Sequence, residues 1–282
     1  MKRSLHWSFD YFDESRRPPR VSGLHPLGEP LFHELLKTYL ESAYPNVVPE
    51  NSECSLRYVV VSNWAPGRPL ESPWNDGGGP DIRAGEATIR RKPAADGKLQ
   101  FSATYENHTS GERGEADFTC RNDPFRTLAG GWSLAVENTA GGECRGYEMW
   151  GRAVKNGEES LLLDISYDRK VYIPLGQVPA SVPCTTNWAL LEAFPALAAA
   201  GQPRNKVNFA ILDDLEKLKP HNTLGYLEKF SQVINGSSVE LEGYHVHGTG
   251  TIPAYYWLDD QGHVAIMTNL YLTYVLQDIA IE

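Results

Sequence analysis

Alternation of apolar and polar residues dominates the chain beyond residue 50, and such alternation places successive side chains on opposite faces of a β-strand. Residues 87–92 and 98–106 alternate in this way on either side of Asp96-Gly97. An Asp-Gly pair between two alternating runs favours a tight turn. The pattern therefore predicts a β-hairpin here.

Asn235-Gly236 gives the same turn signal between two further runs. Gly and Asn separate most of the other runs. Because parallel pairing needs a long crossover, usually a helix, these strands are expected to pair as an antiparallel meander of about ten strands. The remaining predicted strands cover residues 55–62, 115–121, 132–138, 145–154, 160–167, 170–173, 224–234, 238–247, 255–258, 263–268 and 270–277.

Helical spacing of apolar residues occurs in two segments. Residues 29–42 predict an amphipathic helix. Residues 187–194 predict a second helix, with Thr185 or Thr186 as its N-cap and Pro195 placed to kink or end it. The segment from Pro174 to Cys184 reads as a proline-rich connection.

The pattern as a whole predicts a mainly β (α+β) fold. We expect a curved antiparallel meander sheet, half-barrel or barrel-like, with one or two helices packed across its open side. Residues 1–50 form an N-terminal arm with the amphipathic helix, and residues 51–282 form one β-rich domain. A chain of 282 residues can bury a core without help from disulfides or metal.

Charge and hydropathy narrow the classes of partner. The net charge is -10, from 36 acidic and 26 basic side chains, so the overall field repels nucleic acid. No stretch of eighteen apolar residues predicts a transmembrane segment. The first ten residues lack the apolar stretch of a signal peptide, which favours a cytoplasmic location, while export remains open if a signal was removed. The pattern leaves the oligomeric state undetermined.

The four cysteines are far apart and lack the C-x-x-C spacing of zinc or redox sites. Cys54, Cys120, Cys144 and Cys184 therefore read as free thiols. A Cys120–Cys144 disulfide is the alternative for an exported protein.

His245 and His247 are two apart in a predicted strand, so both imidazoles face the same side of the sheet, as metal ligands can. His263, His221 or Glu228 could supply a third ligand, and no spacing selects one. The alternative is two histidines on a polar strand face.

Two acidic pairs, Asp213-Asp214 and Asp259-Asp260, fall at predicted turns. Adjacent strand residues point to opposite faces, and aspartate favours turns through local hydrogen bonds. Turn formation is therefore the preferred interpretation over paired catalytic carboxylates.

Residues 62–85 form a long segment without periodicity, and loops of that length are often functional lids. Trp64, Arg68 and Trp74 lie in it and are candidate ligand contacts. Trp257 is a further candidate with Tyr255, since aromatic rings offer apolar faces with a polar edge.

The carboxy-terminal third carries a resemblance. Asn-Trp-Ala-Leu-Leu at 187–191, Gly-Thr-Gly-Thr-Ile-Pro at 248–253 and Tyr-Trp-Leu-Asp-Asp-Gln-Gly at 256–262 resemble the ends of uncharacterised bacterial β-rich proteins. Those are similar to half-barrel carriers of the lipoprotein-chaperone kind. The resemblance implies a curved sheet lidded by helices that holds an acyl chain.

Two functions follow as hypotheses. The first is binding of an apolar or amphiphilic, lipid-like small molecule in the concave face of the sheet, with residues 62–85 as a lid. The second is an enzyme, a lyase or hydrolase acting on a carbohydrate-like metabolite, using His245, His247 and Tyr255 or Tyr256 with or without a metal. The sequence identifies no cofactor.

Overall fold

The computed structural model describes most of the chain beyond residue 50. The described residues are 48–49, 52–62, 83–108, 111–139, 144–201, 206–234, 237–269 and 272–282. The helix predicted at 29–42, the arm at 1–50 apart from residues 48–49, and the segment with Trp64, Arg68 and Trp74 lie outside them.

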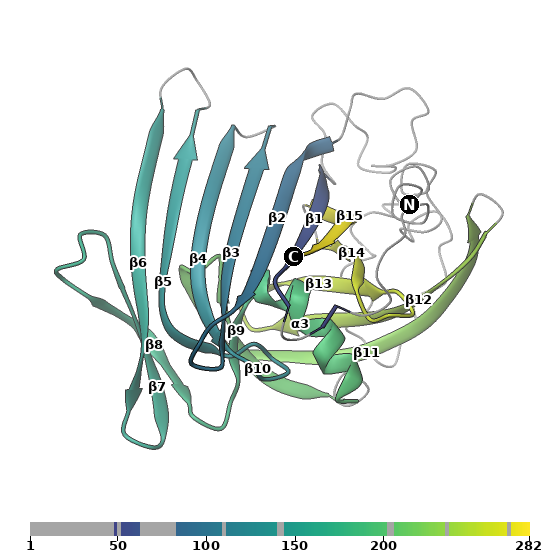
Figure 1. Ribbon diagram of the computed structural model, residues 1–282. Coiled ribbons are helices and arrows are strands. Elements are labelled where there is room, and N and C mark those ends of the chain that lie inside the picture. Colours follow the sequence, from purple (N-terminus) through teal and green to yellow (C-terminus); the bar gives the residue numbers. More distant parts are fainter. Residues whose placement is uncertain are drawn as a thin grey trace.

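Fifteen strands in the described residues form a single sheet (Figure 1). Their order across the sheet is β8-β7-β6-β5-β4-β3-β2-β1-β15-β14-β13-β12-β11-β10-β9. The bounds are β1 Cys54–Ser62, β2 Arg83–Pro93, β3 Lys98–Asn107, β4 Glu112–Arg121, β5 Leu128–Asn138, β6 Arg145–Asn156, β7 Ser160–Ser166, β8 Ile173–Pro179, β9 Cys184–Thr186, β10 Val207–Asp213, β11 Lys217–Ile234, β12 Ser237–Gly248, β13 Thr251–Leu258, β14 Val264–Thr268 and β15 Leu272–Ile281.

Two antiparallel meanders make up this sheet, β1 to β8 and β10 to β15, and β9 adds to β10 in parallel. The meanders meet where β1 pairs with β15, with Cys54 opposite Ile281 and Ser62 opposite Leu272. The predicted antiparallel meander is thus confirmed. Local sequence patterns did not predict that the first strand, β1, pairs with the last strand, β15.

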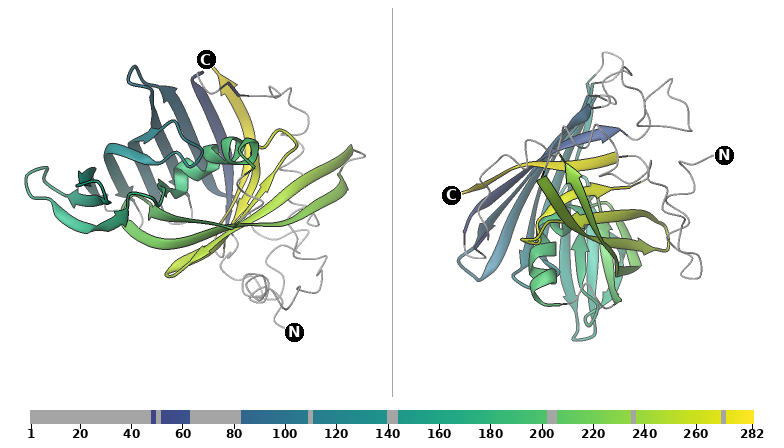
Figure 2. Two further views of the ribbon diagram at one scale, coloured as in Figure 1. Left: turned by 90° about the horizontal axis from the view of Figure 1, so that it is seen from below. Right: turned by 90° about the vertical axis from the view of Figure 1, so that its right-hand side faces the viewer.

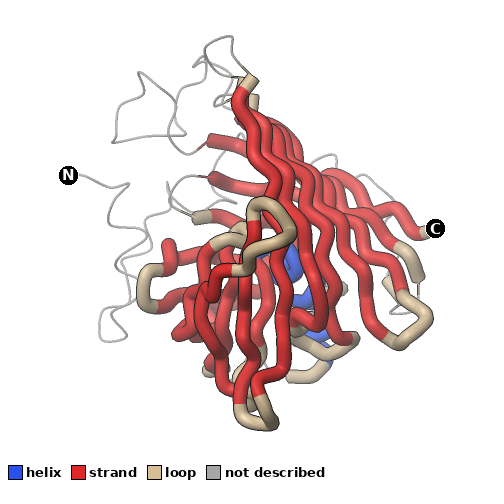
Figure 3. The backbone as a smooth tube through the Cα atoms, turned by 90° about the vertical axis from the view of Figure 1, so that its left-hand side faces the viewer, coloured by secondary structure: helices blue, strands red, loops and turns tan. Residues whose placement is uncertain are grey.

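The sheet bends into a nearly closed barrel shape (Figures 2 and 3). The edge strand β8 approaches β11 so closely that a Cβ at Gly176 would lie 2.9 Å from Leu218 Cδ2. The absence of a side chain at Gly176 permits this approach. Of the two expected shapes, the barrel-like one is correct and the half-barrel is wrong, because the accumulated twist of long strands curls the sheet until its β8 edge lies against β11.

One helix is present among the described residues, α3 (Asn187–Ala199), and it lies within the curve of the sheet (Figure 2). Thr186 caps it, since its side chain accepts a hydrogen bond from Ala189 N at 2.9 Å. Pro195 does not end the helix at about Phe194, one of the two expected outcomes, because the helix continues to Ala199. Burial of Phe194 and Leu197 on either side of the proline holds the last turn in place despite the missing hydrogen bond.

The count of about ten strands was too low. The segment from Pro174 to Cys184 contains most of β8 and the start of β9, and β10 was not predicted at all. Pro174 and Pro179 made β8 look like a loop. An edge strand tolerates proline because one side of its backbone needs no ladder partner, and β8 forms one edge of the sheet.

Candidate functional site

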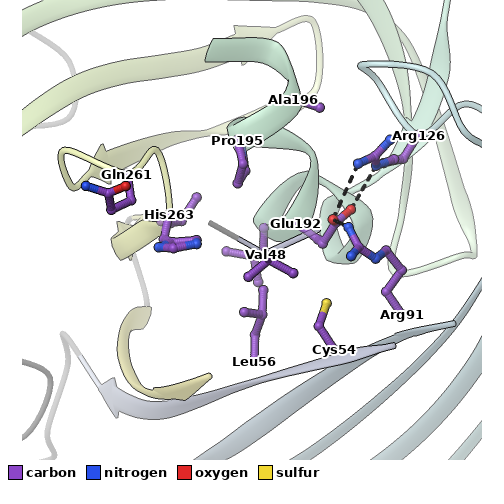
Figure 4. Close-up of a pocket in the computed structure, with 12 residues that line it drawn as sticks. Val48, Cys54, Leu56, Arg91, Arg126, Glu192, Pro195, Ala196, Gln261 and His263 are labelled. Carbon is purple, nitrogen blue, oxygen red and sulfur yellow. Dashed lines mark hydrogen bonds and ion pairs between the residues drawn. The ribbon is translucent and has the colours of Figure 1, made fainter. Parts of the chain in front are cut away.

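A cavity of about 270 Å³ lies between α3 and the strands β1, β2 and β14 (Figure 4). It is therefore inside the curve of the sheet, where the helix faces the barrel wall. Its lining is Val48, Cys54, Leu56, Arg91, Arg126, Leu191, Glu192, Pro195, Ala196, Gln261, His263 and Val264.

Three buried charges gather at one end of this cavity. Arg91 Nη1 of β2 donates to Glu192 Oε1 of α3. Arg126 Nε, from the loop between β4 and β5, donates to Glu192 Oε2 at 2.8 Å. The two arginines are 2% exposed and the glutamate 5% exposed. Charges so far from water require partners, and here one carboxylate pairs with two guanidinium groups.

Of the other two guanidinium nitrogens of Arg91, one forms hydrogen bonds to the described residues and one does not. Its Nη2 donates to Pro49 O at 2.7 Å and to Ser52 O at 3.2 Å. Its Nε is buried and has no hydrogen-bond partner in the described structure. A buried donor without a partner loses its hydration with no compensation, so this atom marks a place where an acceptor would be favourable.

Arg126 is held in an unusual backbone conformation, with φ at +50°. Positive φ is costly for a residue with a side chain. The turn bond from Arg126 N to Asp123 O (2.9 Å) and the bond from Nη1 to Asn122 Oδ1 (2.8 Å) fix the loop and the guanidinium together. The surrounding contacts thus place this cation at the cavity end.

Apolar side chains form the middle of the cavity. Leu56, Leu191 and Val264 are buried there, and Cys54 lies beside them. Burial raises the pKa of the Cys54 thiol to about 11, against the lowering effect of the Arg91 charge. The thiol is therefore protonated near neutral pH and acts as part of the apolar wall, not as a nucleophile.

The end opposite the three charges approaches the surface. Gln261 is exposed, while His263 is buried. Asp259 accepts hydrogen bonds from Gln261 N (3.0 Å) and His263 N (2.7 Å), and its Oδ2 lies 3.3 Å from His263 Nδ1. This is the turn role expected for Asp259. Figure 4 shows Gln261 and His263 across the cavity from Glu192 and the arginines.

A second hollow of about 440 Å³ lies at another part of the barrel wall. Tyr105 and Trp188 stack there with ring centroids 5.5 Å apart. Tyr105 donates to Glu112 Oε1 at 2.6 Å, and burial raises the pKa of this tyrosine. The lining is Tyr105, Glu112, Leu134, Val136, Asn138, Arg145, Gly146, Tyr147, Trp188, Asp214 and Glu216.

Asp214 stands in the turn between β10 and β11, as expected, with φ at +48°. It also lines the second hollow, a role that turn chemistry did not suggest. Its carboxylate accepts from Asn187 Nδ2 at 2.8 Å. Partial removal of this carboxyl from water, and then the charge of Asp213, raise the pKa of Asp214 to about 6, although Asn187 opposes the shift.

His245 and His247 lie on one face of β12, and their rings stack in parallel with centroids 5.0 Å apart. Burial lowers the pKa of His245 to about 4, helped by His247 and Lys206. No group of three His, Cys, Asp or Glu side chains that could hold a metal is found among the described residues. Metal binding by this pair stays a prediction.

Tyr255 and Trp257 are buried on one face of β13, and neither lines the two hollows described above. Tyr256 takes the other face, where it packs on Phe194 of α3 with centroids 4.5 Å apart. The alternation expected from the sequence therefore holds. A ligand-contact role for Tyr255 and Trp257 remains a prediction.

Sequence reasoning missed Arg91, Arg126 and Glu192, although two signals were present. Arg91 continues the inward series of Ala87 and Ile89 in β2, where an apolar residue is the norm. Glu192 is the single charged residue of helix α3, and the residues after Asn187 are otherwise apolar. A charge on a buried face is rare and points to a paired or functional group.

All four cysteines are free; Cys144 is exposed and Cys120 buried, so no Cys120–Cys144 disulfide forms in this structure. Among the helices that the structure describes, none has the length and apolar character needed to span a membrane.

Comparison with solved structures supports a barrel-like β fold. A crystal structure of a beta-barrel-like protein of a domain of unknown function, DUF1849, from Brucella abortus matches with a TM-score of 0.50 and 10% identity, covering 82% of this chain and 98% of that one. At this identity the likeness shows the fold alone, and it extends well beyond the carboxy-terminal third.

The dehydratase domains of the CurF and CurK modules of Curacin polyketide synthase match with TM-scores of 0.12 and 0.11, at 9% and 8% identity. Scores this low do not indicate a shared fold. They cover 90% of this chain and 84% and 83% of their own. No family model matches the chain. No curated protein matches it either.

Proposed function

We propose that the protein binds a small apolar or amphiphilic molecule in the cavity between α3 and strands β1, β2 and β14. The observation that carries this proposal is a cavity of about 270 Å³ with an apolar middle and a few polar groups confined to its ends. Ligand sites are concave, mostly apolar and furnished with a small number of placed polar groups. A barrel-like fold supplies such a space next to its core.

The cavity size favours a compact ligand. Pockets for drug-sized ligands span roughly 300–1,000 Å³, and this cavity lies just below that range. A short alkyl chain or a single ring system suits it better than the long acyl chain implied by the resemblance to lipoprotein carriers.

Calorimetric titration with 1-hexanol, 1-octanol and 1-decanol tests the proposal. Because burial of one methylene contributes about 0.8 kcal/mol, affinity should rise about fourfold per methylene until the cavity is full. Alkanols carry no charge, so the series reports on the apolar space alone.

A matched pair of variants locates the binding. Ala196 lines the cavity, whereas Ala200 is exposed at the end of the same helix. Ala196→Leu should weaken alkanol binding at least tenfold, and Ala200→Leu should leave it unchanged. The absence of any binding, or equal binding by the two variants, would refute the proposal.

A second candidate function is hydrolysis of a carbohydrate-like substrate in the second hollow, at residues other than the His245, His247 and tyrosine set expected from the sequence. The half-buried ring of Tyr105, packed on the buried Trp188, gives this hollow an apolar side for a sugar beside Asp214 and Glu216. An acid with a pKa near 6 is suited to proton transfer near neutral pH. Aryl glycosides releasing a coloured phenol test this function: turnover lost in Asp214→Asn supports it, and no turnover across α- and β-linked substrates rejects it.

A further inference from the structure

The buried end of the cavity carries more positive than negative charge. Arg91 and Arg126 each bear one positive charge, and Glu192 bears one negative charge. Asp123 is nearby, but it is only half-buried and its carboxylate is engaged with Thr127 N at 3.0 Å. Among the residues that the structure describes, the fully buried groups at this end of the cavity therefore leave one positive charge without a buried counter-charge.

Such an excess is unfavourable in a region that water does not reach, because an uncompensated charge loses its hydration there. The unpartnered Nε of Arg91 adds to this imbalance. Arg91, which carries this unpartnered Nε and one of the two positive charges, lines the cavity. One anionic acceptor placed in the cavity beside Arg91 would balance the excess positive charge and accept a hydrogen bond from Nε.

We propose, on the basis of the binding function above, that the ligand is an amphiphilic monoanion whose carboxylate lies against Arg91 and Arg126. Its apolar body occupies the space lined by Leu56, Leu191 and Val264. The end farthest from the carboxylate points toward the exposed Gln261.

The charge count selects the ligand class. A single negative charge balances the excess of one, whereas a dianionic phosphate monoester would leave a buried negative charge. A cation would meet two guanidinium groups and be repelled. Arginine also suits a carboxylate because its planar N–H groups match the two oxygens in geometry.

Titrations with decanoate, 1-decanol and decylamine at pH 8 separate the charge effect from the apolar one. The three chains are equal in length and differ in the head group. Decanoate should bind at least tenfold more tightly than 1-decanol, and decylamine should bind most weakly. The preference for decanoate should persist at about 0.5 M salt, because the charged end is buried and poorly screened.

Two variants change the charge in opposite directions. Arg91→Gln removes the excess positive charge and should abolish the preference for decanoate while leaving 1-decanol binding in place. Glu192→Gln removes the negative charge, which increases the excess of positive charge, and should strengthen decanoate binding several-fold. The comparison of the three ligands on the wild-type protein keeps the test decisive if either variant fails to fold.

The two proposals fail in different ways. Equal affinity for decanoate and 1-decanol would overturn the monoanion proposal and leave the binding function standing. Tighter binding of decylamine would overturn it as well. No binding of any of the three would overturn the function itself.

Discussion

Phe194 of α3 packs against Tyr256 of β13, with ring centroids 4.5 Å apart and ring planes 33° apart. The first ring comes from the helix inside the barrel, and the second comes from the wall. Phe194 also lies 5.8 Å from the ring of Tyr244 on β12. These contacts anchor the end of the helix that lines the cavity.

Phe194→Ala should destabilise the protein by about 3–5 kcal/mol, because it removes a fully buried ring and leaves a cavity. Urea unfolding followed by tryptophan fluorescence measures the change. Tyr167→Ala is the matched control, since Tyr167 is 56% exposed and its loss should cost less than about 0.5 kcal/mol. Similar losses in both variants would contradict the buried contact.

Glu192→Met should destabilise the protein by about 3–5 kcal/mol, because it leaves Arg91 and Arg126 buried without their shared carboxylate. Replacing all three residues with methionine should recover most of that loss, since an apolar set needs no counter-charge. The free energies of unfolding of the single and triple variants check this. A single variant as stable as wild type would show that the three side chains do not depend on one another.

Asp214→Asn should flatten the pH dependence of stability between pH 4 and 6. The folded-state pKa of Asp214 is raised to about 6 from an ordinary value of 3.8. The folded state therefore binds more protons in this window, and stability falls as pH rises through it. Asparagine keeps the acceptor for Asn187 and tolerates the positive φ.

The gain in Asp214→Asn at pH 7 should be up to about 1 kcal/mol, a value discounted because the residue is exposed and solvent screens its charge. Thermal unfolding at pH 4, 5, 6 and 7 measures it. A wild-type curve parallel to that of the variant would contradict the shifted pKa.

His245→Phe should remove an acid sensitivity. The folded-state pKa of His245 is lowered to about 4 from 6.5, so the unfolded state binds more protons between these values. Stability is therefore lost as pH falls from about 6.5 toward 4, by an amount of order 2 kcal/mol.

The phenylalanine keeps a ring beside His247 and replaces the buried Nδ1 that has no partner. Urea midpoints at pH 7 and pH 4.5 give the comparison: the wild-type midpoint should drop more than that of the variant. Equal drops would mean that His245 is accessible to protons in the folded state.

Local patterns were enough to find most strands and their turns. The alternation around Asp96-Gly97 predicted the β2–β3 hairpin, and the structure pairs Lys92 with Gln100 there. Thr186 was one of two expected caps, and it caps α3. These features depend on residues close in sequence, so the sequence by itself determined them.

The closure of the barrel and the cavity were decided only by tertiary structure. Cys54 and Ile281 pair although the whole β domain separates them in sequence. Arg91, Arg126 and Glu192 meet from a strand, a loop and a helix. No spacing rule joins such distant residues, because which ones meet depends on how the sheet bends and on where the helix packs inside it.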